Sequence, residues 1–367
     1  MARKNISTEL VEIFQHQILS GQLKANEPLD AISKLAKQYR TTIATISKVL
    51  AHLEQAGYVE RFQGKGVFVK EKTNCRIALV LDSGAFAQNS ANVSFIPILL
   101  NELEKKSQEE NWTYELFLGV DSNSSAQNFL LKLVQNAFDV VLIGSRWLAK
   151  NSEDIFKNQF VFAIGIYPYK DLDFSISFDF CKMVYDAVLE LDQQGCQQIA
   201  LVENDKDQSW SKDPDCHIRA YHDALKSIGK MRNDQLHFKV PVSQKGGYDA
   251  FCELVKNTTT RPLGIISVDS LITLGIVQAA LSKDLNSREN VIIATQTNQG
   301  CGVAQITIPV IKFECSLITY LEHIAQFIKR YNQGCKNPVG IDLIAPEKKN
   351  VWNNRCIRKK IVADRVK

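Results

Sequence analysis

Hydrophobic side chains recur with the period of an α-helix in three segments near the start of the chain. The pattern predicts helices over about residues 7–20, 31–39 and 43–55. Thr42 directly precedes the third segment and is a residue type that caps helix N-termini. We expect the third helix to bury one stripe of apolar side chains, formed by Ile43, Ile46, Val49, Leu50 and Leu53.

After Gly57 the pattern changes to the alternation of strands, over residues 59–62 and 67–69, around the turn Gly64-Lys65-Gly66. Three helices followed by such a hairpin predict a winged helix-turn-helix, an α+β domain, over residues 1–70. The third helix has the size of a major-groove reader, and the turn glycines allow close approach to the sugar-phosphate backbone. The candidate DNA contacts are Thr41, Thr42, Ala44, Thr45, Lys48, Gly64, Lys65 and Gly66.

Four segments of this region, at 18–23, 35–36, 49–59 and 62–69, resemble in order and spacing the N-terminal domain of GntR-family bacterial transcription regulators. The resemblance covers about residues 7–70 and implies binding to duplex DNA as a dimer. Ser33, Ile43 and Ser47 stand where the family usually has arginine. Arginine to guanine is the commonest specific base contact, so we expect reading through thymine methyls, phosphates and groove shape instead.

From residue 76 onward, short apolar runs alternate with helical patterns, which is typical of parallel, doubly wound α/β sheets. The expected strands are 77–81, 114–120, 140–143, 160–164, 199–202, 236–240, 263–266 and 291–294. The expected helices are 95–110, 124–135, 179–194, 216–228, 248–256, 269–282 and 312–332. Two rounds of this pattern, joined near residues 165–178, predict a two-lobed α/β domain over 75–345, preceded by a linker at 71–74.

This second domain resembles the sugar-sensing domain of LacI/GalR regulators and their periplasmic-binding-protein relatives. The resemblance rests on residues 138–144, 160–165, 178–200, 267–275 and 291–294. It implies a small-molecule effector, of which carbohydrate is the expected class, bound between the lobes at the carboxyl ends of the strands. His217 and Gln296 fall where that family has an arginine and an aspartate, and Arg219 is shifted by two places. The candidate effector contacts are Asp82, Ser83, Phe95, Ser145, Arg146, Asp179, His217, Arg219, Asp269 and Gln296.

Each of these candidates has an ordinary structural alternative. Asp179 and Asp269 both precede an expected helix, and an aspartate there often only caps that helix. The polar residues that follow strands of the first lobe can also simply face solvent without contacting a ligand. The sequence leaves both interpretations open.

Charge differs along the chain. Residues 1–72 contain eleven Lys or Arg and seven Asp or Glu, a net charge of +4, whereas residues 73–347 have a net charge of −7. A basic tail at 346–367 ends the chain, with a net charge of +7 over its last twenty residues. This distribution fits a DNA-reading domain attached to a body that does not contact DNA. The tail is either a solvated end or an added source of phosphate attraction.

The absence of other sequence motifs argues against several classes of protein. No apolar run approaches the length of a membrane span, and the nine cysteines are scattered without a Cys-x-x-Cys motif. We therefore expect a cytoplasmic protein with reduced thiols, no membrane partner, no structural zinc and no cofactor. Common hydrolase, metalloprotease and phosphate-loop motifs are absent from the sequence.

These observations predict a homodimeric, ligand-responsive transcription regulator, a repressor, whose partners are a duplex operator and a sugar-like effector. Two alternatives stay open from sequence. One is a dimeric small-molecule sensor that has lost sequence-specific DNA binding. The other is a sugar-modifying enzyme that uses the cleft between the lobes. Salt-dependent DNA binding separates the first alternative from the main prediction, and turnover of a bound sugar would indicate the second.

Overall fold

The computed structural model describes residues 6–19, 22–70, 75–86, 95–136, 138–152, 155, 162–165, 168–172, 174–205, 211–299, 308–332 and 340–350. The chain forms two compact units. The first comprises residues 1–84, 101–177 and 320–342, and the second comprises residues 85–100, 178–319 and 343–367. The expected linker at 71–74 and the tail beyond residue 350 lie outside the described residues. No helix in the described part of the chain is long and apolar enough to cross a membrane.

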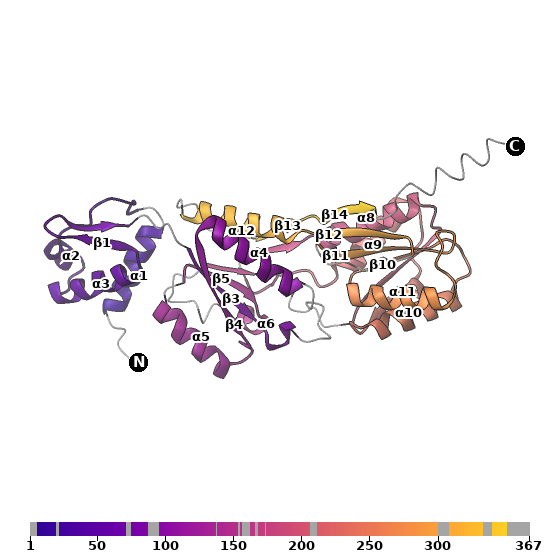
Figure 1. Cartoon of the computed structure of the whole chain (residues 1–367), viewed down its shortest axis with the longest axis horizontal. Coiled ribbons are helices and arrows are strands. Elements are labelled where there is room, and N and C mark those ends of the chain that lie inside the picture. Colours follow the sequence, from indigo (N-terminus) through magenta and orange to yellow (C-terminus); the bar gives the residue numbers. More distant parts are fainter. Residues whose placement is uncertain are drawn as a thin grey trace. The chain divides into compact units, whose positions relative to one another are not determined.

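The N-terminal residues form the expected three helices and hairpin (Figure 1). The elements are α1 (Ile6–Leu19), α2 (Ile32–Gln38), α3 (Ile43–Gln55), β1 (Val59–Phe62) and β2 (Gly66–Val69). Their common core includes Phe14, Leu35, Ile46 and Leu50. The winged helix-turn-helix fold is therefore confirmed.

One detail of the expected core is wrong. Ile43 is 58% exposed, while the other four positions of the stripe on α3 are fully buried. Ile43 is the first residue of the helix, directly after the cap Thr42, so its side chain precedes the turns that pack on α1 and α2. An apolar side chain is thus left at the exposed N-terminus of α3.

The first α/β sheet has the strand order β13-β7-β6-β5-β3-β4. Its strands are β3 (Cys75–Leu81), β4 (Trp112–Leu118), β5 (Val140–Gly144), β6 (Phe162–Gly165), β7 (Phe174–Phe178) and β13 (Gly340–Ile344). The helices that follow β3, β4 and β5 in the chain are α4 (Phe95–Glu110), α5 (Asn123–Asn136) and α6 (Arg146–Lys150). Every pairing from β4 through β7 is parallel, as the near-continuous apolar strands predict.

The second sheet has the order β14-β12-β11-β10-β8-β9. Its strands are β8 (Gln198–Asn204), β9 (His237–Val240), β10 (Leu263–Ser267), β11 (Val291–Asn298), β12 (Val310–Cys315) and β14 (Glu347–Asn350). The pairings are parallel except for the edge strand β14, which is antiparallel to β12. Four helices accompany this sheet: α8 (Phe180–Gln193), α9 (Cys216–Ser227), α10 (Gln244–Asn257) and α11 (Ser270–Ser282).

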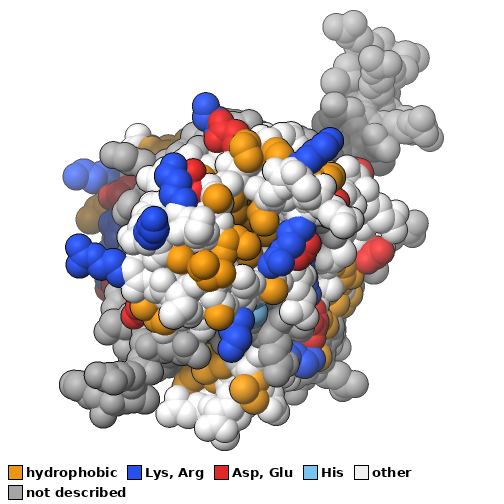
Figure 2. All heavy atoms as spheres, turned by 90° about the vertical axis from the view of Figure 1, so that its left-hand side faces the viewer, with side chains coloured by type: hydrophobic (Ala, Val, Ile, Leu, Met, Phe, Trp, Pro, Cys, Tyr) orange, Lys and Arg blue, Asp and Glu red, His pale blue; other side chains and the backbone are white. Residues whose placement is uncertain are grey.

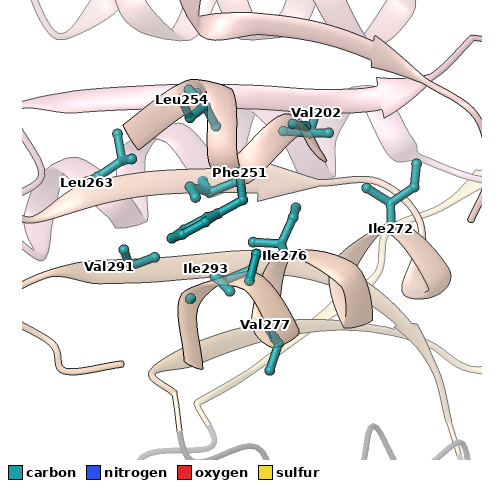
Figure 3. Close-up of a cluster of buried hydrophobic side chains, with 14 of the residues drawn as sticks. Val202, Phe251, Leu254, Leu263, Ile272, Ile276, Val277, Val291 and Ile293 are labelled. Atoms are coloured by element: carbon teal, nitrogen blue, oxygen red, sulfur yellow. The ribbon is translucent and has the colours of Figure 1, made fainter. Parts of the chain in front are cut away.

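Alternate residues of the second sheet face two separate hydrophobic cores. Val202, Leu263 and Ile293 pack with Phe251 of α10 and Ile276 of α11 (Figure 3). Their sequence neighbours on the same strands, including Leu201, Ile266 and Ile292, pack with side chains of α8 and α9. The sheet is therefore buried on both faces, which is the doubly wound arrangement expected from the sequence.

Glycines allow α10 and α11 to approach closely. A Cβ on Gly275 would lie 1.8 Å from the carbonyl oxygen of Gln244, and one on Gly247 would lie 2.0 Å from the carbonyl oxygen of Ile272. No side chain fits at these distances. The sequence analysis began α10 at residue 248, but the helix starts at Gln244 and includes the glycines, with the Ser243 hydroxyl accepting a hydrogen bond from the Gly246 amide.

The expected long helix at 312–332 is wrong in its first turn. Residues 310–315 form β12 beside β11, because their apolar and polar residues alternate as in a strand. Helix α12 begins only at Leu317 and ends at Asn332. Residues 320–342 belong to the first unit, where the Phe327 ring stacks on Phe174 at 4.8 Å and Lys329 pairs with Glu110 at 2.9 Å. The two rounds of the sequence pattern are thus not two uninterrupted halves of the chain.

The strands β7, β13 and β14 were not expected. Residues 165–178 had been interpreted as the join between lobes, yet residues 174–178 form a fully buried strand of the first sheet. Its sequence, Phe-Ser-Ile-Ser-Phe, alternates as expected for a strand. Strand β13 then comes from the far end of the chain to flank it.

Candidate functional site

The N-terminus of α3 presents most of the expected DNA contacts. The Thr42 hydroxyl accepts a hydrogen bond from the Thr45 amide at 3.1 Å, so Thr42 is the N-cap that the sequence predicted. The hydroxyls of Thr42 and Thr45 are 2.9 Å apart. Ala44 and Lys48 are exposed, and Thr41 is half-buried in the preceding turn. With exposed Ile43, this surface combines hydroxyl, methyl and ammonium groups.

The hairpin forms the wing. Strands β1 and β2 are antiparallel, with Phe62 opposite Gly66. Gly64 and Gly66 have φ angles of 75° and 113°, in the region that glycine adopts without strain, and Lys65 lies exposed between them. Within the described residues, neither Lys65 nor Lys48 forms an ion pair, so both ammonium groups are available for phosphate oxygens.

Figure 2 views the side of the molecule on which the wing domain lies in Figure 1. Hydrophobic side chains gather in the middle of this face, and Lys and Arg side chains are spread around them. The exposed large hydrophobic residues of the domain are Ile6, Ile13, Ile43 and Phe62. The face is therefore mixed in character rather than uniformly basic.

Arg61 connects the wing to helix α3. The sequence pattern did not identify it as a functional residue. Its guanidinium donates to the Ser47 carbonyl oxygen at 3.2 Å and pairs with Glu54 at 3.0 Å. Both partners lie on α3, so the arginine braces the hairpin against the helix. In the sequence Arg61 is only one of two adjacent charged residues in the expected strand, which does not reveal its partners.

A buried hydrogen bond joins the wing domain to the first α/β sheet. The Tyr58 hydroxyl donates to one Asp139 carboxylate oxygen at 3.2 Å, and the Arg76 amide donates to the other at 2.9 Å. Tyr58 is 1% exposed and Asp139 is 5% exposed. Asp139 precedes β5, so this carboxylate connects the wing domain, β3 and β5 within the first unit.

Four of the expected effector residues meet at the carboxyl ends of β3 and β5. The Arg146 amide approaches an Asp82 carboxylate oxygen at 3.4 Å, and its guanidinium lies 3.9 Å from the same oxygen. Ser145 is buried and caps α6. Ser83 is exposed, and its amide donates to Asp121 at 3.1 Å.

Asp121 is the member of this group that the sequence analysis missed. It comes directly after the residues expected as the second strand, so the rule that selected Asp82 would have selected it too. Burial raises the pKa of the Asp82 carboxyl, and the neighbouring Asp121 carboxylate acts in the same direction. Two carboxyl groups side by side favour a shared proton or hydroxyl donors from a ligand.

Phe95, the remaining candidate from the first round of the sequence, is the first residue of α4 and is only 9% exposed. Its segment, residues 85–100, belongs to the second unit. The role of Phe95 as an effector contact stays a prediction.

Asp179 and Asp269 both cap helices. An Asp179 carboxylate oxygen accepts from the Lys182 amide at 2.8 Å, and Asp269 accepts from the Leu271 amide at 2.8 Å. Asp269 is 6% exposed and lies just beyond β10, next to a buried hydroxyl network of Ser267, Thr273 and Thr295. Capping accounts for part of each carboxylate's bonding, as the alternative interpretation held.

His217 belongs to a buried carboxylate cluster of the second sheet. Glu203, at the end of β8, lies 3.3 Å from His217 Nδ1 and 2.7 Å from His237 Nε2, one carboxylate oxygen to each ring. Burial alone would raise the pKa of Glu203, but the two histidine hydrogen bonds outweigh it and lower that pKa to about 2. The sequence pattern does not single out Glu203, which directly follows the expected strand at 199–202.

Arg219 and Gln296 occupy separate surroundings. The exposed Arg219 guanidinium pairs with Asp213, and this pairing raises the Arg219 pKa. Gln296 lies on β11, where its side-chain nitrogen donates to Asn298 Oδ1 at 3.0 Å and approaches Cys315 Sγ at 3.6 Å. In the parallel register Gln296 comes one residue beyond Thr295, which is paired with Ser267, so it is close to the carboxyl edge of the sheet.

Metal binding has no support in the described part of the chain, where no group of three His, Cys, Asp or Glu side chains has a geometry able to hold an ion. The polar residues instead bond to one another, to helix amides and to hydroxyls. Such groups suit an uncharged ligand rich in hydroxyls, which both donates and accepts hydrogen bonds.

Comparison with known proteins supports both halves of the fold. Residues 6–69 match the family model of bacterial regulatory proteins of the gntR family. No curated protein matches the sequence closely enough to count as a relative. The N-terminal domain is thus a GntR-type winged helix-turn-helix.

Solved structures resemble the rest of the chain. A sugar-binding transcriptional regulator of the LacI family from Escherichia coli, complexed with phosphate, is 17% identical with a TM-score of 0.57, over 75% of this chain and 96% of that one. The transcriptional regulator CelR in complex with cellobiose is 13% identical with a TM-score of 0.57, over 95% and 98%. A dimeric Lac repressor is 12% identical with a TM-score of 0.59, over 75% and 98%. At these identities the likeness establishes the shared fold.

Proposed function

We propose that this protein is a ligand-responsive transcription regulator that binds duplex DNA as a homodimer and acts as a repressor. The observation that carries the proposal is the combination of a GntR-type winged helix, whose α3 N-terminus and wing lysine are exposed, with a LacI-type α/β fold on one chain. Its place of action is the cytoplasm, where operator DNA is found.

The DNA-reading half supports moderate sequence specificity. Thr42, Ala44 and Thr45 offer methyl and hydroxyl groups to a major groove, and Lys48 and Lys65 offer charge to phosphates. Exposed Ile43 adds apolar contact where a guanine-reading arginine is usual. Selection from random duplexes is expected to return an A/T-leaning palindrome, and a sharply G/C-defined half-site would contradict this interpretation of α3.

The effector is a small polyhydroxylated molecule, with carbohydrate as its class. The support is the polar groups at the carboxyl ends of both sheets: Asp82, Ser83, Ser145 and Arg146 in the first unit, and Asp179, His217, Arg219, Asp269 and Gln296 in the second. Similar folds bind such ligands, as the complex of CelR with cellobiose illustrates. Carboxylates that accept two hydroxyl protons at once orient a sugar strongly when buried.

Regulation follows from linkage. An effector changes operator affinity only by as much as it prefers one conformation of the protein over another. The buried Tyr58–Asp139 hydrogen bond gives the wing domain and the first sheet a shared contact through which such a preference can act.

The direct test is salt-titrated binding of the full chain to duplex DNA from its own promoter region. Lys48→Ala and Lys65→Ala are each expected to weaken binding and to reduce the salt slope by about one phosphate contact. Lys245→Ala is the matched control, because that exposed lysine lies on α10 and pairs with Asp249. Binding that ignores salt and both wing-domain lysines would favour a sensor that no longer reads DNA, and turnover of a bound sugar would favour an enzyme.

A further inference from the structure

Two cysteines meet where α8 and α9 begin. Cys181 is the second residue of α8, Cys216 is the first residue of α9, and the two thiols lie close enough to shift each other's pKa. Both are half-buried, so they remain reachable from solvent. The helices pack together along their length, and the Phe180 ring meets the His217 ring edge-on at 6.2 Å. This packing brings the two cysteines, which are the sequence neighbours of these rings, close to each other.

The surroundings distinguish the two sulfur atoms. The hydrogen bond from Cys216 lowers the pKa of Cys181; Arg219 acts in the same direction, whereas burial and the carboxylates of Asp213 and Asp179 oppose it. The same bond and burial raise the pKa of Cys216, which keeps its proton. Thiols at helix N-termini gain thiolate character from the helix amides. Cys181 is therefore the nucleophile of the pair, and Cys216 is the donor beside it.

The other described cysteines lack this arrangement. Cys75, Cys196 and Cys315 are buried, and burial raises the pKa of Cys196 and of Cys315 to about 12. Cys252 on α10 is half-buried like the pair and packs against the core of the second sheet. It is a natural comparison, because it shares the exposure of Cys181 without a neighbouring thiol hydrogen bond in the described structure.

We propose that Cys181 and Cys216 form an oxidisable dithiol, a modification site that a hydroperoxide converts reversibly to an intramolecular disulfide. The Cys181 thiolate attacks one peroxide oxygen, the O–O bond breaks, and Cys181 becomes a sulfenic acid; the hydroxide or alkoxide that leaves takes a proton from solvent and becomes water or an alcohol. The Cys216 sulfur then attacks the Cys181 sulfur, the S–OH bond breaks, and a second water leaves with the Cys216 proton. Two thiols are oxidised by two electrons in total, and the peroxide is reduced.

The disulfide connects this site to regulation. Asp179, His217 and Arg219 flank the two cysteines in sequence, and all three are proposed effector contacts. Joining Cys181 to Cys216 fixes the starts of both helices and draws the sulfur atoms to a bond length of about 2.05 Å. This consequence rests on the proposed function, whereas disulfide formation itself does not.

The test uses the full reduced chain treated with hydrogen peroxide, quenched with an alkylating reagent, digested without reductant and analysed by mass spectrometry. We expect a peptide pair linked through Cys181 and Cys216, which disappears on treatment with dithiothreitol. Cys181 is expected to be oxidised faster than Cys252, because the neighbouring Cys216 thiol lowers the pKa of Cys181 and the thiolate is the form that attacks a peroxide. Cys216→Ser should leave Cys181 as a sulfenic acid that dimedone traps, and Cys252→Ser should change nothing.

Circular dichroism melts of each variant separate lost chemistry from lost folding. A linked peptide in wild type and in Cys252→Ser, but in neither Cys181→Ser nor Cys216→Ser, supports the dithiol. Oxidation of Cys181 no faster than that of Cys252, or no Cys181–Cys216 link in folded wild type, overturns it. Operator binding measured on the same oxidised sample reports separately on regulation, so the disulfide can be confirmed even where the proposed function fails.

Discussion

The candidate binding residues of the wing domain and those of the α/β sheets differ in whether their charged groups already have partners within the protein. Lys48 and Lys65 are exposed and form no ion pair among the described residues, whereas Asp82, Asp179, Asp269 and Glu203 are each held by amides, histidines or another carboxylate. The first surface is ready for a large anionic partner. The second is a set of preorganised polar groups, which lose less entropy when a small ligand binds.

The same contrast explains what sequence reveals. The wing domain is local: its helices, its Thr42 cap and its glycine hairpin each follow from a few neighbouring residues. The α/β groups depend on topology. Glu203 contacts His217 and His237, which are 14 and 34 residues away along the chain. Asp82 contacts Arg146, which is 64 residues away. Hydrophobic periodicity predicts the strands that carry such residues but not the partners they meet.

The largest errors had the same origin. Strand β12 was merged into the expected helix at 312–332, and nothing in residues 310–332 shows that the chain returns to the first unit. The return is fixed by contacts such as Phe327 on Phe174, which are distant in sequence. The error at Ile43 was local, since a helix period cannot tell that the first turn lacks a packing partner.

Glycine substitutions are expected to give the largest changes in the free energy of unfolding. They compare a contact between residues distant in sequence with a local turn. Gly275→Ala places a Cβ 1.8 Å from the Gln244 carbonyl oxygen, so α10 and α11 must separate. We expect a loss of about 3 kcal/mol or more in the free energy of unfolding of the second unit. Gly64→Ala, at φ 75° with open space around it, should cost only about 1 kcal/mol.

Urea unfolding followed by circular dichroism measures both variants. Gly84→Ala is the control, because its Cβ meets nothing within 4 Å and its backbone needs no positive φ. Equal losses for Gly275→Ala and Gly84→Ala would show that the helix crossing is looser than described here.

The Glu203 cluster tests how much a buried group with partners distant in sequence contributes to stability. Glu203→Gln removes a buried carboxylate bonded to His217 and His237, and we expect a loss of about 2 kcal/mol at pH 7. The folded pKa of about 2 lies below the ordinary value of 4.5, so this stabilisation is present above pH 4.5 and is lost as pH falls toward 2.

Denaturant unfolding across this pH range checks the prediction. Glu115→Gln, which removes a more exposed partner of Lys132, should cost less than about 1 kcal/mol. A difference between wild type and Glu203→Gln that does not shrink at low pH would mean that the carboxylate charge is not the source of the stability.

Removing the Tyr58–Asp139 hydrogen bond tests a buried contact between the wing domain and the first sheet. Tyr58→Phe should cost about 1 kcal/mol, because Asp139 loses a buried donor. Hydrogen–deuterium exchange should rise at the Arg76 amide, which bonds to the same carboxylate. Tyr221→Phe, which removes a buried hydrogen bond to the Ile199 carbonyl in the second unit, should leave exchange at Arg76 unchanged.

The smallest expected change in stability comes from Asp269, where substitutions distinguish a helix cap from an effector contact. Asp269→Asn should change stability by only a few tenths of a kcal/mol, because asparagine caps as well as aspartate, whereas Asp269→Ala should cost about 1 kcal/mol. Ser243→Ala removes a comparable cap from α10 and serves as the control. A thermal-shift screen of sugars against all three variants should show weakened ligand stabilisation only for the Asp269 variants, and unchanged ligand stabilisation there would remove Asp269 from the effector site.

The central claim is that one chain couples DNA reading to a small polyhydroxylated ligand. The most direct measurement is the fluorescence anisotropy of a labelled operator, selected from random duplexes, bound to the full chain and titrated at fixed salt with a panel of mono- and disaccharides. We predict that a sugar which raises the melting temperature also changes operator affinity at least five-fold, the lower range of allosteric coupling at about 1 kcal/mol. A sugar that stabilises the protein and leaves operator affinity unchanged, or a panel in which none binds, would contradict the account.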